Sequence, residues 1–327
     1  MLDETCYKPG EVLFDRYRVV TLLGHGGMGS VYKVTELQEP GASPLALKIL
    51  NSQQAAVLEK RSRFINEYHT LLRLSQAPVA KALALHDEVD GDIAFSLEFL
   101  PGSTLEELIE STAQKKLALA DSIFILKAIA HAFIAIHEAG IICRDIKPSN
   151  IIISPRFSEI KNCASPILAN ALKIIDFGIA CDSGCVPGSS ARAAGTALYT
   201  PPESGAVLAA SPVHDIYAFG VLAYLLLTGE PPFKSQEIGA LNDERITNDV
   251  PSPRLLDSRI SVALALIVNT CAAAEHTRRF TSFNQVLACL NAMTPRPDVG
   301  PFGGAVSGFA VRLGLLQGRE PFIKSIA

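Results

Sequence analysis

The sequence predicts an α+β fold in two parts: a β-rich N-terminal part with one helix, and a mainly helical remainder. Short runs of β-branched and aromatic residues, separated by glycine- or proline-rich turns, fill roughly the first 100 of the 327 residues. Long apolar segments at helical spacing dominate roughly the next 190. Strands and helices that are separated along the chain in this way are typical of α+β proteins.

Local patterns predict the individual elements. Apolar and β-branched residues between turn signals predict strands over residues 16–23, 30–35 and 45–50. A helix is expected next, because Phe64, Tyr68 and Leu71 share one helical face. Two short strands are expected near residues 82–85 and 93–97. The later apolar segments predict helices over residues 123–137, 216–228, 262–274 and 283–290.

Composition excludes several classes of protein. The 29 Lys and Arg residues nearly balance the 33 Asp and Glu residues, so nothing predicts a strong positive field for nucleic acid. The longest uncharged runs, residues 260–274 and 216–229, are too short to span a membrane. The acidic N-terminus does not resemble a secretory signal. Seven irregularly spaced cysteines favour free thiols. We therefore expect a cytoplasmic protein that has no membrane span and binds no nucleic acid.

The glycine-rich run Gly24-His25-Gly26-Gly27-Met28-Gly29 lies between two expected strands. A dinucleotide-binding loop would instead lead from a strand into a helix. A glycine-rich hairpin is the other device that covers phosphates, because glycine lets the backbone approach closely. Lys48 lies in the next apolar strand and Glu67 on the following helix, where Glu67 could neutralise a buried Lys48. A purely structural ion pair is the alternative.

The strongest local motif is Cys143-Arg144-Asp145-Ile146-Lys147-Pro148-Ser149-Asn150. It places a candidate base, a cation and a metal-binding amide within six positions, counted from Asp145 to Asn150. Asp176-Phe177-Gly178 then supplies a carboxylate at the end of a short apolar run. Asp and Asn also favour turns, so loop capping is the alternative function of Asp145 and Asn150.

Taken in order, these motifs resemble those of the Hanks-type Ser/Thr protein kinases of bacteria. Three later segments support the resemblance: 195–203 (GTALYTPPE), 215–220 (DIYAFG) and 227–233 (LTGEPPF). The resemblance implies a bilobal kinase-like fold, with an N-lobe of antiparallel sheet plus one helix and a helical C-lobe. The expected divisions are an N-terminal arm 1–16, a kinase domain 17–294 with lobes 17–100 and 101–294, an insertion 154–172, and a Pro/Gly-rich tail 295–327.

The resemblance also implies a role for each motif residue. Lys48, held by Glu67, binds the α- and β-phosphates of ATP, and Asp145 accepts the proton of the substrate hydroxyl. Lys147 neutralises the transferring phosphoryl group. Asn150 and Asp176 hold Mg²⁺, or Mn²⁺ in its place. The nucleotide-binding residues are Leu23, Gly24, Gly26, Gly29, Val31, Ala46, Lys48, the gatekeeper Leu97, and Glu98 and Leu100 of the hinge. The structural residues are Arg144, Glu203, Asp215 and Arg279.

Two residues indicate the substrate class. Lys147, two residues after Asp145, and Thr196 match the Ser/Thr kinase pattern, so protein substrates with Ser or Thr hydroxyls are expected. Ser189 or Ser190 is a candidate autophosphorylation site, since a phosphate there could pair with Arg144. The alternative is that both are simply polar loop residues. A homodimer would allow autophosphorylation in trans.

Two features depart from the family pattern. Cys143 replaces the usual His, which reduces a packing contact but removes no proton-transfer group. The connection 154–172 is longer than usual. A pseudokinase that acts as a nucleotide-binding scaffold is therefore the alternative function, although Lys48, Asp145 and Asp176 are all present. A small-molecule kinase is less favoured, because such enzymes lack a segment like 195–203.

Overall fold

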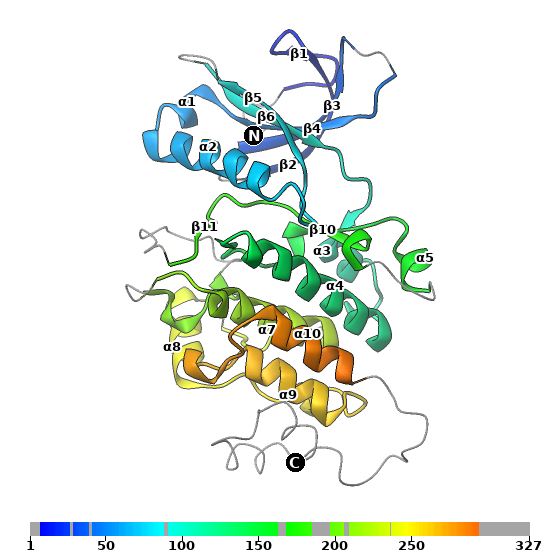
Figure 1. Cartoon of the computed structure of the whole chain (residues 1–327), viewed down its shortest axis with the longest axis vertical. Coiled ribbons are helices and arrows are strands. Elements are labelled where there is room, and N and C mark those ends of the chain that lie inside the picture. Colours follow the sequence, from blue (N-terminus) through cyan, green and yellow to red (C-terminus); the bar gives the residue numbers. More distant parts are fainter. Residues whose placement is uncertain are drawn as a thin grey trace.

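The computed structural model describes residues 7–26, 29–38, 41–87, 91–162, 168–184, 197–205, 209–235 and 237–293. It shows two lobes stacked along the long axis of the molecule, a β-sheet lobe with its helices above a helical lobe (Figure 1). The predicted α+β division of the chain is confirmed. The N-lobe comprises β1 (Val12–Leu13), β2 (Tyr17–Gly26), β3 (Gly29–Glu36), β4 (Leu45–Leu50), α1 (Ser52–Ala55), α2 (Leu58–Arg73), β5 (Ala82–Asp87) and β6 (Ile93–Glu98).

The six N-lobe strands among the described residues form one antiparallel sheet in the order β1-β2-β3-β4-β6-β5. Each expected strand is present, and β2 extends beyond the expected end to Gly26. Strand β1 lies in the segment that the sequence assigned to an N-terminal arm, and it pairs with β2 through Val12 and Arg18. One face of the sheet covers α2, whose Phe64 packs on Phe95 of β6 with ring centroids 4.7 Å apart.

The glycine hairpin between β2 and β3 uses its glycines for two different reasons. Gly29 has a φ of +108°, and a Cβ there would lie 2.1 Å from the backbone oxygen of Ile49. A larger residue would therefore push β3 away from β4. Gly24 and Gly26 have no atom within 4 Å of a would-be Cβ, so the space beside them is open. Packing explains Gly29, whereas the other two glycines leave the hairpin backbone accessible to a ligand.

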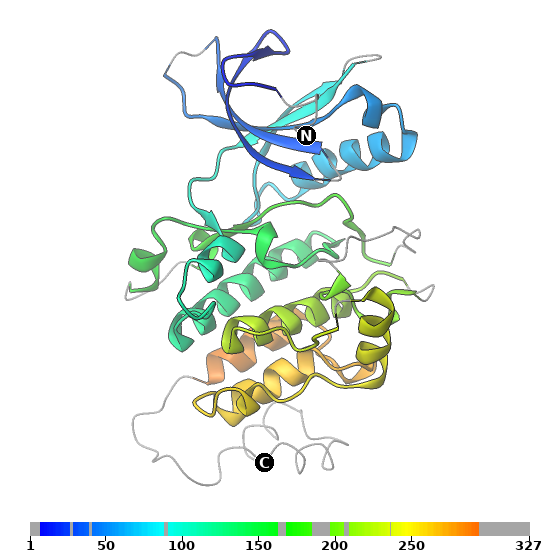
Figure 2. The same cartoon turned by 180° about the vertical axis from the view of Figure 1, so that it is seen from behind.

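The C-lobe is built around α4 and α7, which lie side by side in both views (Figures 1 and 2). Helix α10 covers α4, and Phe133 meets Phe283 with ring centroids 5.2 Å apart. Helix α9 packs closely on α7, since a Cβ on Gly220 would lie 2.6 Å from the backbone nitrogen of Ala272. The C-lobe elements are β7 (Ser103–Thr104), α3 (Leu105–Glu110), α4 (Leu119–Glu138), β8 (Ile141–Ile142), β9 (Ile151–Ile153), α5 (Phe157–Lys161), β10 (Leu172–Ile174), β11 (Cys181–Asp182), α7 (Pro212–Thr228), α8 (Ile238–Thr247), α9 (Val262–Cys271) and α10 (Phe283–Ala292).

The described residues also include five short 3-10 helices: Pro148–Asn150, Leu168–Asn170, Pro202–Gly205, Pro253–Leu255 and His276–Arg278. The expected insertion connects the antiparallel strands β9 and β10, and it contains α5. Phe157 of α5 packs edge-on against Phe124 of α4, and Lys161 pairs with Asp121 at 2.6 Å. The described part of the insertion is therefore docked on α4 rather than extended from the lobe.

Helix α4 is the one helix of the described residues that is long and apolar enough, by length and composition, to cross a membrane. A search for uncharged runs misses it, because Asp121, Lys127 and Glu138 interrupt the apolar sequence. In the structure, Ile125, Ile129 and Phe133 of α4 are fully buried in the C-lobe core. This is the environment of a core helix. The cytoplasmic location stays a prediction.

Candidate active site

The first group of site residues joins the two lobes through Lys48. Its Nζ lies 2.6 and 2.7 Å from the two carboxylate oxygens of Glu67, and 3.6 Å from Oδ1 of Asp176. Lys48 projects from β4, Glu67 from α2, and Asp176 from the segment after β10. The expected pairing of Lys48 with Glu67 is present, and the structure adds Asp176 as a second carboxylate on the same ammonium.

Burial and nearby charges shift the pKa values of the three residues in this group in different directions. Attraction to Lys48 keeps the pKa of Asp176 below its ordinary value. Burial raises the pKa of Glu67 to about 7, and Lys48 opposes this rise only in part. The two carboxylates outweigh the effect of burial on Lys48 and raise its pKa. At neutral pH the ammonium and Asp176 are therefore ionised, and Glu67 is the group closest to a change of protonation.

The second group surrounds Asp145 in the loop between β8 and β9. Its Oδ2 accepts hydrogen bonds from Nζ of Lys147 and Nδ2 of Asn150, each at 2.8 Å. Asn150 also donates to the backbone oxygen of Asp145 at 3.0 Å. The other carboxylate oxygen, Oδ1, is buried and has no hydrogen-bond partner among the described residues. A buried acceptor without a partner fits a site that receives a hydroxyl donor from a substrate.

Asp215, at the start of α7, holds this loop in place through hydrogen bonds to its backbone. Its Oδ1 accepts the backbone N–H of Arg144 at 2.7 Å, and its Oδ2 accepts that of Cys143 at 2.9 Å. His137 of α4 also contacts Oδ2 through Nε2, at 2.8 Å. Arg144 has a φ of +66°, and Asp176 a φ of +68°, an uncommon conformation for residues with side chains. Sequence analysis included position 137 only as the end of an expected helix and did not predict the contact of His137 with Asp215.

Cys143 is fully buried, in the same hydrophobic cluster as Phe177, and this cluster includes residues of both lobes. Burial, with the nearby carboxylate of Asp215, raises the pKa of its thiol well above the ordinary value. The thiol is therefore protonated at neutral pH and behaves as a small apolar group. Its surroundings agree with a packing role at the position where the family usually has His.

The expected nucleotide-binding residues lie on β2, β3, β4 and β6. The strand register pairs Val31 with Lys48 and Ala46 with Leu97, which places these four side chains on one face of the sheet. Leu23 of β2 is 47% exposed, so an apolar surface is available near the glycine hairpin. The face carries both an apolar area and a cation, as a site for a base and its phosphates requires.

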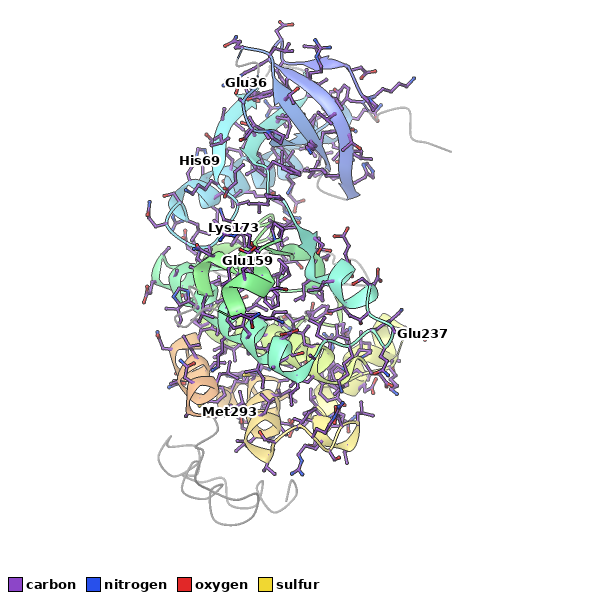
Figure 3. The ribbon with its side chains drawn as sticks, turned by 90° about the vertical axis from the view of Figure 1, so that its right-hand side faces the viewer. Glu36, His69, Glu159, Lys173, Glu237 and Met293 are labelled. Atoms are coloured by element: carbon purple, nitrogen blue, oxygen red, sulfur yellow. The ribbon has the colours of Figure 1, made fainter. Side chains whose placement is uncertain are left out.

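The expected hinge is fixed at its first residue, Glu98. Its side chain accepts a hydrogen bond from the backbone N–H of Lys81 at 2.9 Å, and it also pairs with Lys173 of β10. Figure 3 shows Lys173 at the top of the C-lobe, where the two lobes meet. Phe99 is the next residue of the hinge, and Nζ of Lys33 lies over its ring, 4.5 Å from the ring centroid. Leu100 follows and is half-buried.

The oxygen atoms of Asp176 and Asn150 fit a small divalent cation. Oδ1 of Asp176 accepts from the backbone N–H of Gly178 at 3.1 Å, and the side chain remains about one third exposed at 34%. The amide nitrogen of Asn150 is used by Asp145, which leaves the amide oxygen as the ligand atom. Across the described residues, no cluster of three or more His, Cys, Asp or Glu side chains could hold a metal. Two protein ligands suit Mg²⁺, which usually takes its other ligands from water and phosphate.

The segment after the site is held by Arg279. Its Nη1 and Nη2 donate to the two carboxylate oxygens of Glu203 at 2.5 and 2.8 Å, and its side chain is fully buried. Tyr217 of α7 lies beneath the guanidinium, 4.7 Å from its carbon to the ring centroid. The remaining predicted residues, Ser189, Ser190 and Thr196, lie outside the described residues.

Comparison with known proteins agrees with this geometry. A family model described as the protein kinase domain matches residues 17–290. The chain is 29% identical over 302 residues to the serine/threonine-protein kinase pkn3 of Myxococcus xanthus. The aligned region covers 89% of this chain and 53% of the relative. It is 30% identical over 294 residues to a probable serine/threonine-protein kinase of Corynebacterium efficiens, with coverages of 86% and 42%.

A third relative is the serine/threonine-protein kinase PknJ of Mycobacterium tuberculosis, which is 28% identical over 302 residues, with coverages of 91% and 47%. The chain thus spans about half the length of these curated relatives, as the coverages of 53%, 42% and 47% show. The match to the kinase model includes every described residue of the site. The chain therefore belongs to the protein kinase family, within the Hanks-type Ser/Thr kinases found in bacteria.

Proposed function

We propose that the chain is a Ser/Thr protein kinase that transfers the γ-phosphoryl group of Mg-ATP to hydroxyls of protein substrates. The observation that carries this proposal is the unpartnered Oδ1 of Asp145, whose other carboxylate oxygen is held by Lys147 and Asn150. In this role Asp145 orients the attacking hydroxyl and accepts its proton at Oδ1. Lys147 neutralises negative charge on the transferring group.

The other residues bind and orient. Lys48, fixed by Glu67, pairs with phosphate oxygens, and the open backbone at Gly24 and Gly26 lies over them. Asp176 and Asn150 would supply oxygen ligands for Mg²⁺, which would offset the negative charge of the phosphates. Lys147 is close enough to Asp176 to lower its pKa, which links the two groups of site residues electrostatically. The pseudokinase alternative is not favoured, because none of these chemical groups is missing.

Intact-mass measurement tests the proposal directly. The purified chain would be incubated with ATP and MgCl₂ beside Asp145→Asn and Asp121→Asn variants. Asp121 lies in the first turn of α4 and forms a partly exposed ion pair with Lys161 of α5, so it serves as the matched control. Phosphate additions in the wild type and Asp121→Asn, but not in Asp145→Asn, are expected. Equal additions in all three proteins would show that a contaminating kinase acts, and would contradict the proposal.

Absence of transfer in a folded wild type that binds ATP would favour the scaffold alternative. ATP binding is read separately as a rise in melting temperature, because a ligand that binds only the folded state stabilises it. Phosphopeptide mapping then tests Ser189 and Ser190, and finding both unmodified in active protein would exclude them. Dependence of the specific rate on protein concentration tests autophosphorylation in trans.

A further inference from the structure

Arg245 of α8 is buried without a carboxylate partner. It is 4% exposed, and none of the ion pairs between described residues includes it. Its Nη1 donates to the backbone oxygens of Ala197, at 2.5 Å, and of Thr200. Its Nε donates to the backbone oxygen of Leu241 at 3.3 Å, and its Nη2 donates to the side-chain oxygen of Asn242. Every one of these partners is an uncharged oxygen.

Such burial is unfavourable unless the hydrogen bonds compensate for it. Removing a charge from water is strongly unfavourable when the charge is left unpaired. Burial lowers the pKa of Arg245, but a guanidinium remains protonated in proteins. Carbonyl dipoles therefore stabilise the charge through charge-assisted hydrogen bonds, and the carboxylate of Glu203 adds a longer-range attraction. Leu241 and Asn242 belong to the same helix as Arg245, so among the hydrogen-bond partners of Arg245 only Ala197 and Thr200 belong to another segment.

The segment that Arg245 contacts is anchored at two points along its length. Arg245 anchors its first part, at Ala197 and Thr200, and Arg279 anchors its second part, at Glu203. Between the two Arg245 contacts, Tyr199 is buried and lies close enough to Glu106 of α3 to have its pKa raised further by that carboxylate. Helix α3 in turn contacts the 3-10 helix Pro148–Asn150 that ends the Asp145 loop. Residues 197–205 are therefore fixed by two buried arginines, and α3 connects their Tyr199 with the end of the Asp145 loop.

We infer that Arg245 is a positioning residue, which fixes residues 197–200 as the surface that presents a peptide hydroxyl to Asp145. The inference rests on the proposed kinase function. Because Arg245 contacts neither the Lys48 group nor the Asp145 group, its loss should weaken the use of peptide and leave the use of ATP nearly unchanged. A residue needed only for folding would affect both equally.

Steady-state kinetics distinguish these cases. The Arg245→Met variant keeps an unbranched apolar side chain but removes the charge and its donors, and Arg245→Lys restores the charge with a single nitrogen. Arg259→Met is the control, since Arg259 is 79% exposed in its pair with Asp257. The probes are Mg-ATP and a Ser-containing peptide selected on a peptide array. We expect Arg245→Met to raise the peptide KM about tenfold or more, with the KM for ATP and peptide-independent ATP hydrolysis within about twofold of wild type.

Arg245→Lys should recover part of the loss, and Arg259→Met should match the wild type. Equal losses in peptide phosphorylation and ATP hydrolysis would overturn the inference, as would no change in either. If Arg245→Met does not fold, Asn242→Ala provides the second test. It removes a side-chain partner of the guanidinium without removing the buried charge, and it should raise the peptide KM by a smaller factor.

Hydrogen exchange separates this inference from the proposed function. Arg245→Lys should increase amide exchange within residues 197–205 and leave exchange in α7 unchanged, whether or not the chain transfers phosphate. Unchanged exchange in residues 197–205 would overturn the inference alone. A folded wild type that binds ATP but phosphorylates neither itself nor any peptide would overturn the kinase function, and with it the role of Arg245 in peptide presentation.

Discussion

His137 and Asp215 are 78 positions apart in the sequence, yet their side chains meet at 2.8 Å between Nε2 and Oδ2 beneath the Asp145 loop. The same carboxylate receives two backbone N–H groups from that loop. One buried side chain thus connects α4, α7 and the loop that carries Asp145. This arrangement explains how a loop with a left-handed residue at Arg144 keeps one conformation.

Asp215→Asn should therefore lower both stability and activity. The new amide would present a donor where the carboxylate accepts, so at least one buried N–H group would lose its partner. The expected loss is ~3 kcal/mol in the free energy of unfolding, measured by urea denaturation. Asp121→Asn, in a partly exposed pair, should lose no more than about 1 kcal/mol. Equal losses in the two variants would contradict the role of Asp215 as a brace.

Activity should fall as the pH decreases through about 7, because Glu67 then gains a proton and its pair with Lys48 weakens. Stability should respond in the opposite direction. The pKa of Glu67 is raised in the folded state, so its contribution to folding is full below its ordinary pKa of 4.5 and is lost as the pH rises through about 7.

Glu67→Gln should remove this step from both pH profiles, whereas Glu59→Gln, at an exposed position on the same helix, should keep it. The profiles would be measured as kcat/KM for ATP and as urea midpoints. A wild-type activity profile that is flat around pH 7 would show that another group controls the site.

Gly220→Ala should destabilise the C-lobe, because the added methyl group would overlap Ala272 of the segment after α9. The expected cost is ~1–3 kcal/mol, as for other overpacked cores. Gly239→Ala in α8 is the matched control, since nothing lies within 4 Å of its Cβ position. It should be neutral or stabilising by up to ~1 kcal/mol. Thermal unfolding followed by circular dichroism would decide, and a stable Gly220→Ala protein would refute the close packing of α7 on α9.

The buried cysteines should resist alkylation in the native protein. Burial raises the thiol pKa of Cys143 and of Cys271 well above the ordinary value, so little of either thiol is present as the reactive thiolate. Burial also keeps the reagent away from both sulfur atoms. Cys181 is only partly buried, so among the cysteines of the described residues it should react first. Mass spectrometry after a timed iodoacetamide pulse would rank them. Rapid labelling of Cys143 before urea is added would contradict its position in the core.

Much of the fold and of the candidate site could be predicted, because the motifs that identify them are short and contiguous in the sequence. The Asp145 loop and the Asp176 motif are contiguous, and the pairing of Lys48 with Glu67 follows from the need of a buried cation for a partner. His137 and Arg245 could not be found in this way. Each is one polar residue on a helix, and only the tertiary packing shows that its side chain points inward toward a carboxylate or a set of carbonyls.

The insertion illustrates the same limit. Its length indicated an irregular connection, but the sequence did not show that Phe157 would contact Phe124 and place α5 on α4. The double role of the glycine motif was also hidden. Gly24, Gly26 and Gly29 look alike in sequence, and only the distance from Gly29 to the backbone of Ile49 identifies the one that packing requires.

The cover that α10 provides for α4 has a consequence for biosynthesis. The ribosome makes α4, the most membrane-like helix of the described residues, long before it makes Phe283 and the rest of α10. A nascent chain that has passed residue 138 but not residue 283 carries this helix without its final neighbour. The C-lobe can therefore close only late in translation, and until then α4 lacks a helix that covers it and is open to chaperones and to aggregation.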